Sequence, residues 1–346
     1  MYKKFKSLLK KLHRGFFFHI PPSSNLNKKK NILGRQITSF EGGNLNKDKV
    51  FYIIQRHEGE GGIFSDLVFV VNHLKIAKNY GFIPIVDMQN FPRWYNEENK
   101  VKKTFNSWNY YFNPVSKYSL EEVYKSKNLI LTSPIFYSNV DFNYQIQDSE
   151  ELIKIFKEFI QIDKKIHRVV NFFHRKYFKN KKILGVHFRG TSYKYGRNPY
   201  PATIKQMIQK LKKLIKDENY DKVFLVTEDI SHFNALKNEF KNDLLYFKNI
   251  FRSSGKVAFQ NYPRLNHRYK LGRDLLVETC LLSKCDGYLD TRGNVRGAAL
   301  TMNLNNSQKR YLIDNGFNPG IPLISNYLWY IKKFLPSNFG GFKKNL

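Results

Sequence analysis

The sequence predicts an α/β protein with two domains, each built on a largely parallel sheet. Short apolar runs alternate with helical stretches along the chain, and Gly-containing turns follow several of these runs. The length of 346 residues suffices for about two domains. We expect an N-terminal segment and linker at 1–35, a first domain at 36–170 and a second domain at 171–346.

The first 16 residues predict a basic amphipathic helix. Its apolar face comprises Phe5, Leu8, Leu9, Leu12 and Phe16, and lysines and arginines fill the remainder. No small-residue cleavage site follows, and no run of 18 apolar residues occurs in the chain. We expect residues 1–16 to bind an anionic membrane surface, with an ordinary helix packed on the protein as the alternative.

The first domain is predicted to begin with a strand, a Gly-rich loop, a buried helix and a second strand. These elements are expected at 51–54, 57–62, 63–80 and 82–87. Such a unit commonly opens a domain that handles nucleotides or sugars. The aromatic stretch at 88–118 is expected either to line an acceptor cleft or to form a core beneath a long loop.

Repeated strand–helix units predict a parallel sheet with right-handed crossovers in the second domain. A helix at 150–177 leads into it. Strands are expected at 183–188, 222–227 and 287–290, and helices at 203–216, 231–240, 273–284 and 295–303. A final amphipathic helix at 322–335 is expected to cross back to the first domain.

Polar residues follow three of these strands. The three sets are His187, Arg189, Gly190 and Thr191; Thr227, Glu228 and Asp229; and Asp290, Thr291, Arg292, Gly293 and Asn294. Because parallel strands end at one edge of a sheet, all three sets are expected to face one ligand. Arg189, Arg292 and Arg296 would complement a diphosphate, and the helix that follows Gly293 would present N–H groups to a phosphate. Ordinary helix capping by Asp, Asn and Thr is the alternative.

A family resemblance rests on three segments, namely HFRGT, VFLVTED and CDGYLDTRGNVRGAALTMN. They resemble the C-terminal motifs of the fucosyltransferase superfamily, which includes α-1,6-fucosyltransferases, rhizobial nodulation fucosyltransferases and protein O-fucosyltransferases. The resemblance covers roughly 180–305, with looser support from EGEGGIFSDLVFVVNHL. It implies a GT-B fold, in which an acceptor-side and a nucleotide-sugar-binding Rossmann-like domain face a cleft. It also implies inverting transfer of fucose, or a related GDP-linked sugar, without a metal or a cofactor.

The resemblance also implies roles for individual residues. Arg189 would bind the donor diphosphate and favour the departure of GDP, and His187 would support the nucleotide site. The turn at 291–294 would contact donor phosphate, whereas Glu228 and Asp229 would bind ribose or cap the following helix. For the base that deprotonates the acceptor hydroxyl we select Glu58. The acceptor-side loop around it comprises His57, Glu60, Gly61 and Gly62.

The sequence departs from the superfamily at three places. The family's late Ser/Thr-rich turn is here Thr291-Arg292-Gly293-Asn294, so its serines are largely replaced. Gly190 stands where α-1,6 members have a second Arg, and Ser192 stands where several members have Asp. A P-loop, a complete GxGxxG motif and a metal-ligand cluster are all absent, which disfavours P-loop kinases, dehydrogenases and metalloenzymes. Two cysteines, Cys280 and Cys285, are expected to be reduced core thiols of a cytoplasmic protein.

Composition limits the classes of partner. Hydrophobic residues make up 42% of the chain and aromatic residues 16%, which excludes a disordered protein. The 59 Lys and Arg against 28 Asp and Glu give a net charge of +31, which favours acidic partners. The lysines are scattered, and codon bias toward AT-rich sequence produces the same composition, so charge alone selects no partner.

Together these observations predict a cytoplasmic glycosyltransferase, peripheral on the inner face of the membrane. It would use a nucleotide-sugar donor and a glycan or lipid-linked oligosaccharide acceptor, as in capsule or lipopolysaccharide assembly. One alternative is a degenerate family member that binds a nucleotide without transfer, as Gly190, Ser192 and Arg292 would allow. The other is a nucleic-acid-binding protein, which the scattered lysines and the lack of a recognisable nucleic-acid-binding motif disfavour.

Overall fold

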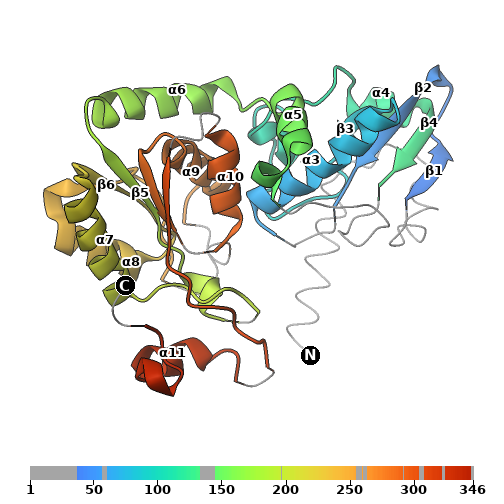
Figure 1. Cartoon of the computed structure of the whole chain (residues 1–346). Coiled ribbons are helices and arrows are strands. Elements are labelled where there is room, and N and C mark those ends of the chain that lie inside the picture. Colours follow the sequence, from blue (N-terminus) through green and yellow to red (C-terminus); the bar gives the residue numbers. More distant parts are fainter. Residues whose placement is uncertain are drawn as a thin grey trace. The chain divides into compact units, whose positions relative to one another are not determined.

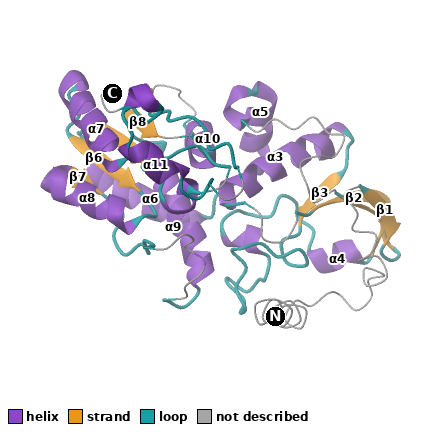
Figure 2. Cartoon of the chain, turned by 90° about the horizontal axis from the view of Figure 1, so that it is seen from below, coloured by secondary structure: helices purple, strands orange, loops and turns teal. Residues whose placement is uncertain are grey.

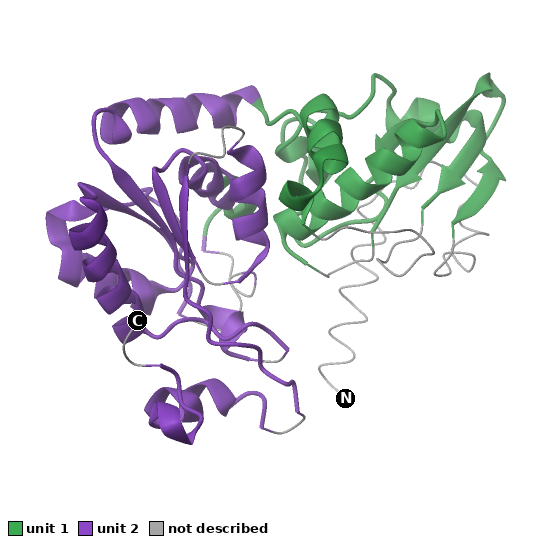
Figure 3. Ribbon diagram, in the orientation of Figure 1, with its two compact units in different colours: residues 1–163, 264–273 green, residues 164–263, 274–346 purple. Residues whose placement is uncertain are grey.

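The computed structural model divides the chain into two units. It describes residues 37–56, 61–132, 145–195, 197–254, 259, 263–290, 292–303, 308–321 and 324–343 (Figure 1). The first unit extends to Asp163 and includes Arg264–Arg273, and the second comprises Lys164–Pro263 and Asp274–Leu346 (Figure 3). Each unit has its own sheet covered by helices, so the predicted α/β fold class is confirmed. The predicted division lay at 170/171, and the expected membrane helix at 1–16 lies outside the described residues.

The first unit has a four-stranded sheet in the order β1-β4-β2-β3. Its strands are β1 (Thr38–Glu41), β2 (Leu45–Ile54), β3 (Ile83–Val86) and β4 (Ser126–Leu131). Strand β2 runs parallel to β3 and β4, whereas the edge strand β1 is antiparallel to β4. Residues Phe51, Ile53, Ile85 and Leu129 pack into one core cluster, so the apolar runs of these strands form the centre of the unit.

Helix α3 (Ile63–Asn79) links β2 to β3 and is buried along much of its length. It ends where Gly81 adopts a positive φ of 68°, a conformation that favours glycine. Shorter helices complete the unit, namely α4 (Leu120–Tyr124) and α5 (Glu150–Phe159), with 3-10 turns at Ser107–Tyr110 and Ile146–Asp148. Of the aromatic residues at 88–118, Tyr95, Trp108, Tyr110, Tyr111 and Phe112 are buried, which favours the core alternative over a cleft lining.

The second unit has a five-stranded, fully parallel sheet in the order β7-β6-β5-β8-β9. Its strands are β5 (Ile183–His187), β6 (Lys222–Val226), β7 (Leu244–Leu245), β8 (Gly287–Asp290) and β9 (Lys309–Leu312). The chain starts in the centre with β5, builds outward through β6 and β7, and then returns to add β8 and β9 on the other side. This is the strand order of a doubly wound Rossmann-like sheet.

Helices cover both faces of this sheet (Figure 2). They are α6 (Lys164–Phe173), α7 (Ile204–Glu218), α8 (Ile230–Phe240), α9 (His267–Leu282) and α10 (Asn294–Met302). On one face, Leu184 and Val186 pack with residues of α7 and α8. On the other, Gly185 lies so close to Leu282 and Cys285 that an added Cβ would approach the Cys285 sulfur to 2.9 Å. Successive residues of β5 therefore pack on opposite faces of the sheet, as expected for a strand.

The helix expected at 150–177 is interrupted. Helix α5 ends at Phe159, α6 begins at Lys164, and a π-helical turn follows at His174–Phe178. Between the two helices the backbone pairs elsewhere: Gln161 accepts a hydrogen bond from the N–H of Asn113, at 2.8 Å. This competing backbone pairing divides the helix, and the boundary between the two units lies at the same place.

The final helix differs from the expectation that it crosses back to the first domain. Helix α11 (Leu328–Phe334) belongs to the second unit, where Trp329 is buried and its indole N–H donates to the Pro201 carbonyl at 2.9 Å. The later segment that belongs to the first unit is instead Arg264–Arg273. There the N–H of Tyr269 donates to the Glu97 carboxylate at 2.8 Å. Within the described residues, no helix is both long and apolar enough to cross a membrane.

Candidate functional site

The three strands that precede the predicted sets of polar residues end at one edge of the second sheet. Strand β5 lies between β6 and β8, and His187 is the register partner of both Val226 and Asp290. All three strands are parallel, so their carboxyl ends lie side by side. In doubly wound sheets of this kind, ligands bind at the carboxyl ends of the strands.

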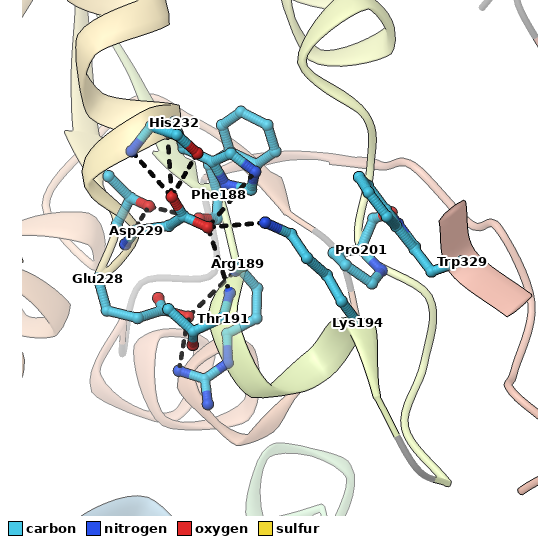
Figure 4. Close-up of polar contacts among 12 residues, drawn as sticks. Phe188, Arg189, Thr191, Lys194, Pro201, Glu228, Asp229, His232 and Trp329 are labelled. Carbon is cyan, nitrogen blue, oxygen red and sulfur yellow. Dashed lines mark hydrogen bonds and ion pairs between the residues drawn. The ribbon is translucent and has the colours of Figure 1, made fainter. Parts of the chain in front are cut away.

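Glu228 organises the turn that follows β5 (Figure 4). Its Oε1 accepts hydrogen bonds from the N–H of Gly190 at 3.1 Å and the hydroxyl of Thr191 at 2.9 Å. The same oxygen lies 3.4 Å from Nη1 of Arg189. Burial alone would raise the pKa of Glu228, but Arg189, His187 and the Gly190 N–H together hold it below its ordinary value. The Glu228 carboxylate is thus ionised, and N–H and O–H groups of the protein already donate hydrogen bonds to it.

Gly190 is required by close packing in this turn. A Cβ at this position would lie 2.6 Å from Oδ2 of Asp229 and 2.9 Å from the His232 ring. Such distances lie far inside van der Waals contact. A side chain immediately after Arg189, such as the second Arg of α-1,6-fucosyltransferases, therefore has no room in this conformation.

Asp229 caps helix α8. Its Oδ1 accepts from the Ser231 N–H at 2.9 Å, and its Oδ2 accepts from the Lys194 ammonium at 2.9 Å and the Thr191 N–H at 3.3 Å. Burial would raise the pKa of Asp229, yet His232, Ser231 and Lys194 hold it well below its ordinary value. Of the two expected roles, helix capping is therefore the one that the geometry shows.

The Thr227 hydroxyl makes hydrogen bonds within the protein. It donates to the Phe188 carbonyl at 2.8 Å and accepts from the Asp229 N–H at 3.2 Å. These bonds join the residue after β5 to the residue that starts α8. Thr227 was expected to bind the nucleotide sugar, but its hydroxyl holds the two turns together.

His187 and Asp290 form the buried floor of the strand edge. Burial lowers the pKa of His187 to about 4 and raises the pKa of Asp290 to about 8. Arg296 approaches Asp290 only to 3.8 Å, between Nε and Oδ1. Within the described residues, Nδ1 of His187 has no hydrogen-bond partner, and Arg296 and the Tyr288 hydroxyl lower the pKa of Asp290 by less than burial raises it. At neutral pH, His187 is therefore neutral and most Asp290 molecules are protonated.

The third turn lies beside the first, through Tyr193. The guanidinium of Arg189 stands 4.4 Å above the Tyr193 ring, and a Cβ on Gly293 would meet the Tyr193 hydroxyl at 3.6 Å. Gly293 is extended, with a φ of 164°, so the backbone itself does not demand glycine there. Asn294 is exposed at the start of α10, whose N-cap supplies no side-chain hydrogen bond. Thr291 lies outside the described residues.

Arg292 is engaged away from this cluster. Its Nη2 lies 2.6 Å from Oδ2 of Asp314, and its side chain is 45% exposed. We expected Arg292 to complement a diphosphate together with Arg189 and Arg296. The structure shows it in a surface ion pair, because Asp314 follows β9 and reaches the same turn, and its role toward a diphosphate stays a prediction.

The acceptor-side loop is only partly described. His57, Glu58 and Glu60 lie outside the described residues, so Glu58 remains a prediction. Gly61 has a positive φ of 80°, which favours glycine, and Gly62 is the N-cap of α3.

Two residues of the site were not predicted: Lys194, which contacts Asp229, and Tyr193, which supports Arg189. Asp290 was expected in the third set, but without its burial or its altered pKa. The only sequence signal for Lys194 and Tyr193 is their position a few residues beyond the strand. Their partners are chosen by tertiary contacts.

The arrangement is suited to an anion. Arg189, Lys194 and Arg296 bring positive charge to the edge, and the first N–H groups of α10 add a partial positive charge. No group of three or more His, Cys, Asp or Glu residues in the described part of the chain is placed to hold a metal ion.

Solved structures that resemble this chain include several fucosyltransferases. They include fucosyltransferase NodZ from Bradyrhizobium, with 15% identity over 72% of this chain and 92% of that one, at a TM-score of 0.46. NodZ α-1,6-fucosyltransferase soaked with GDP-fucose has 14% identity, covers 75% and 97%, and has a TM-score of 0.48. A mutant of Arabidopsis thaliana FUT1 in complex with GDP has 9% identity, covers 89% and 78%, and has a TM-score of 0.39. No family model and no protein of curated function matches the sequence.

Proposed function

We propose that this protein is an inverting glycosyltransferase that uses a nucleotide-diphosphate sugar, with fucose or a related GDP-linked sugar as the group transferred. The observation that carries the proposal is the position of Arg189 at the carboxyl edge of the sheet, held by Glu228 and stacked on Tyr193. A planar, permanently charged guanidinium fixed in this way is suited to a diphosphate. The motif resemblance around 187–191, 223–229 and 285–303 supports the choice of a GDP-linked donor.

In the proposed reaction, the sugar's anomeric carbon forms a bond to an acceptor oxygen as its bond to the donor diphosphate breaks. Arg189 and the N–H groups at the start of α10 stabilise the charge that develops on the leaving diphosphate. A base, for which Glu58 is our choice, accepts the proton of the acceptor hydroxyl. The neutral state of His187 and the protonated state of Asp290 keep additional charge away from the diphosphate.

The acceptor belongs to the same proposal. We assign it to a glycan or lipid-linked oligosaccharide of the cell surface, reached from the cytoplasmic side by a protein peripheral to the membrane. The basic amphipathic pattern of residues 1–16 supports membrane binding. A reaction without metal or cofactor completes this proposal.

A second candidate function is nucleotide binding without transfer. It is favoured by the surface pair of Arg292 with Asp314, which removes one cation from the expected phosphate site. Both candidate functions use the same donor site, but only the glycosyltransferase would turn over a nucleotide-sugar donor.

A thermal-shift screen against GDP, UDP, CDP, ADP and dTDP, each with Mg²⁺ or EDTA, tests the donor. Selective stabilisation by GDP without metal supports a GDP-linked donor, because a ligand that binds the native state raises the melting temperature. Preference for another diphosphate would retain the transferase and reject the GDP-linked donor. No shift with any nucleotide would reject both candidate functions.

Arg189→Ala then tests the site. We expect the nucleotide-induced shift and turnover to be lost while the far-UV circular dichroism spectrum is unchanged. Arg175→Ala is the matched control, because Arg175 is exposed in the turn that precedes the amino end of β5. Unchanged nucleotide binding in Arg189→Ala would contradict the proposal.

A further inference from the structure

An apolar stripe faces solvent on the last helical segment of the second unit. It consists of Ile324, Tyr327, Ile331 and Phe334, whose exposed fractions are 43%, 64%, 48% and 75%. The Leu328 N–H donates to the Ile324 carbonyl and the Ile331 N–H to the Tyr327 carbonyl, so the helical path starts before α11. Their spacing places the four side chains on one face. We call these four residues the docking stripe.

The opposite side of the same segment is anchored to the protein. Trp329 is buried with Tyr200 and Phe342 in a separate core cluster, and its indole N–H binds the Pro201 carbonyl. The Phe342 N–H donates to the Lys332 carbonyl at 3.1 Å. The docking stripe therefore lies on an anchored helical segment that has apolar side chains on its exposed face as well as on its buried face.

The chain segment that carries the stripe has charge of one sign. No Asp or Glu occurs from 315 to 346, whereas Lys332, Lys333, Lys343 and Lys344 do. The Lys333 ammonium lies 5.4 Å from the centre of the Phe334 ring, at the border of the stripe. An exposed apolar face bordered by lysines and aromatic rings has the composition of an interfacial membrane-binding helix.

We propose that the docking stripe inserts into the interfacial region of an anionic lipid bilayer, with the neighbouring lysines contacting the lipid headgroups. Charge selects this partner over a second copy of the chain. Two copies that each carry +31 repel one another, whereas an anionic surface attracts the lysine-rich border. This surface is distinct from residues 1–16, which carry a separate basic amphipathic pattern.

The stripe is connected to the candidate donor site through Trp329. The Lys194 ammonium lies 5.3 Å from the centre of the Trp329 ring and also pairs with Asp229 (Figure 4). One face of the segment thus contacts the turn after β5, while the other face is exposed and available to lipid. If the proposed transfer to a membrane-linked acceptor holds, the bilayer would orient the donor site; the binding itself does not depend on that transfer.

Vesicle flotation of the full-length chain tests the proposal. Vesicles of phosphatidylcholine alone are compared with vesicles that also contain phosphatidylglycerol. The test variant is Tyr327→Gln/Ile331→Gln/Phe334→Gln, and the matched control is Val169→Gln/Phe172→Gln on α6, where the exposed fractions are 38% and 59%. Because residues 1–16 are unchanged in all of these proteins, their contribution to binding is the same in each.

We expect the stripe variant to bind anionic vesicles at least about tenfold more weakly, because apolar insertion and lysine attraction act together. The control variant should remain within about twofold of the wild type. Lys332→Gln/Lys333→Gln should weaken binding to anionic vesicles only, relative to Lys213→Gln/Lys216→Gln on α7. Equal binding by the stripe variant and the wild type would overturn the proposal.

Two further readouts distinguish lipid binding from self-association and from misfolding of the variant. Sedimentation that shows a wild-type oligomer and a monomeric stripe variant, with vesicle binding unchanged, would assign the stripe to a second copy and overturn the proposal. The far-UV circular dichroism spectrum and the melting temperature without ligand should be unchanged in the stripe variant, which establishes that the protein is folded; neither readout requires nucleotide binding, so this test stays separate from that of the proposed function. Loss of binding to vesicles with both readouts unchanged supports the membrane assignment.

Discussion

Arg189 and Glu228 are joined at 3.4 Å between Nη1 and Oε1, and the same oxygen also accepts from Gly190 and Thr191. One carboxylate therefore fixes three consecutive residues of the turn after β5. The Tyr193 ring supports the guanidinium from another side, at 4.4 Å. Arg189 is thus positioned before any ligand arrives, which limits the entropy lost when it binds an anion.

The first prediction concerns the space beside Gly190. Gly190→Ala should lower the free energy of unfolding by about 1–3 kcal/mol, because the new Cβ would lie 2.6 Å from Oδ2 of Asp229 and must displace it. Gly293→Ala is the control, because its Cβ would meet only the Tyr193 hydroxyl, at an ordinary 3.6 Å. Urea denaturation of both variants measures the difference. Equal stability of the two variants would contradict the packing described for the turn.

The second prediction concerns the Asp229–Lys194 pair. Asp229→Asn retains a side chain that caps α8 but loses the charge that pairs with Lys194, and should cost about 1 kcal/mol at pH 7. The folded-state pKa of Asp229 is lowered, so its stabilising effect is complete above the ordinary value of 3.8 and is lost as pH falls further. Urea denaturation at pH 7 and pH 3 should therefore show a difference at pH 7 that shrinks at pH 3. A difference that stays constant would contradict an electrostatic role for Asp229.

The third prediction concerns the buried His232. Its ring stacks on Phe188, with 3.8 Å between centroids, and burial lowers its pKa from 6.5 to about 4. The unfolded chain binds this proton more readily, so folding stability falls as pH decreases from about 6.5 to 4. His232→Phe retains an aromatic ring and removes the titrating group. The variant should lose less stability than the wild type between pH 7 and pH 4 in urea denaturation, and equal losses would contradict the prediction.

The second sheet was predictable because each central strand is a short apolar run with a polar turn at its end. Strands β5, β6 and β8 agree with the expected ranges to within one residue at each end, and their parallel order follows from the intervening helices. Strands β1, β4, β7 and β9 were missed. Three of them, β1, β7 and β9, lie at sheet edges, where fewer residues are buried, whereas the inner strand β4 begins with the polar residues SKN. The sequence KRYL of β9 has no fully buried side chain and so lacks the apolar signal.

The positions of the site residues were predictable, but their partners were not. The sequence indicates that Arg189, Asp229 and Arg292 follow strands, and the structure places the first two at the sheet edge in one network. Arg292 instead pairs with Asp314, because the turn after β9 brings that carboxylate to the surface beside it. Ion-pair partners depend on tertiary contacts that no local sequence pattern contains.

The last prediction concerns Asp290, which is buried at the end of β8 beside His187 on β5 and Arg296 on α10. Burial raises its pKa from 3.8 to about 8. The folded state therefore keeps a proton that the unfolded chain loses above about pH 4, and stability falls as pH rises from there to about 8. At about 1.4 kcal/mol for each pKa unit, the cost at high pH reaches several kcal/mol.

Asp290→Asn removes this cost and should be more stable than the wild type at pH 9 but not at pH 5, as measured by urea denaturation. Asp314→Asn is the control, because the Arg292 partner lowers the pKa of Asp314 and its effect should be constant over that range. An ionised Asp290 would also repel a diphosphate, so wild-type nucleotide affinity should fall above pH 8, whereas that of Asp290→Asn should not. Parallel affinity profiles for the two proteins would place the nucleotide away from Asp290 and thus away from this sheet edge.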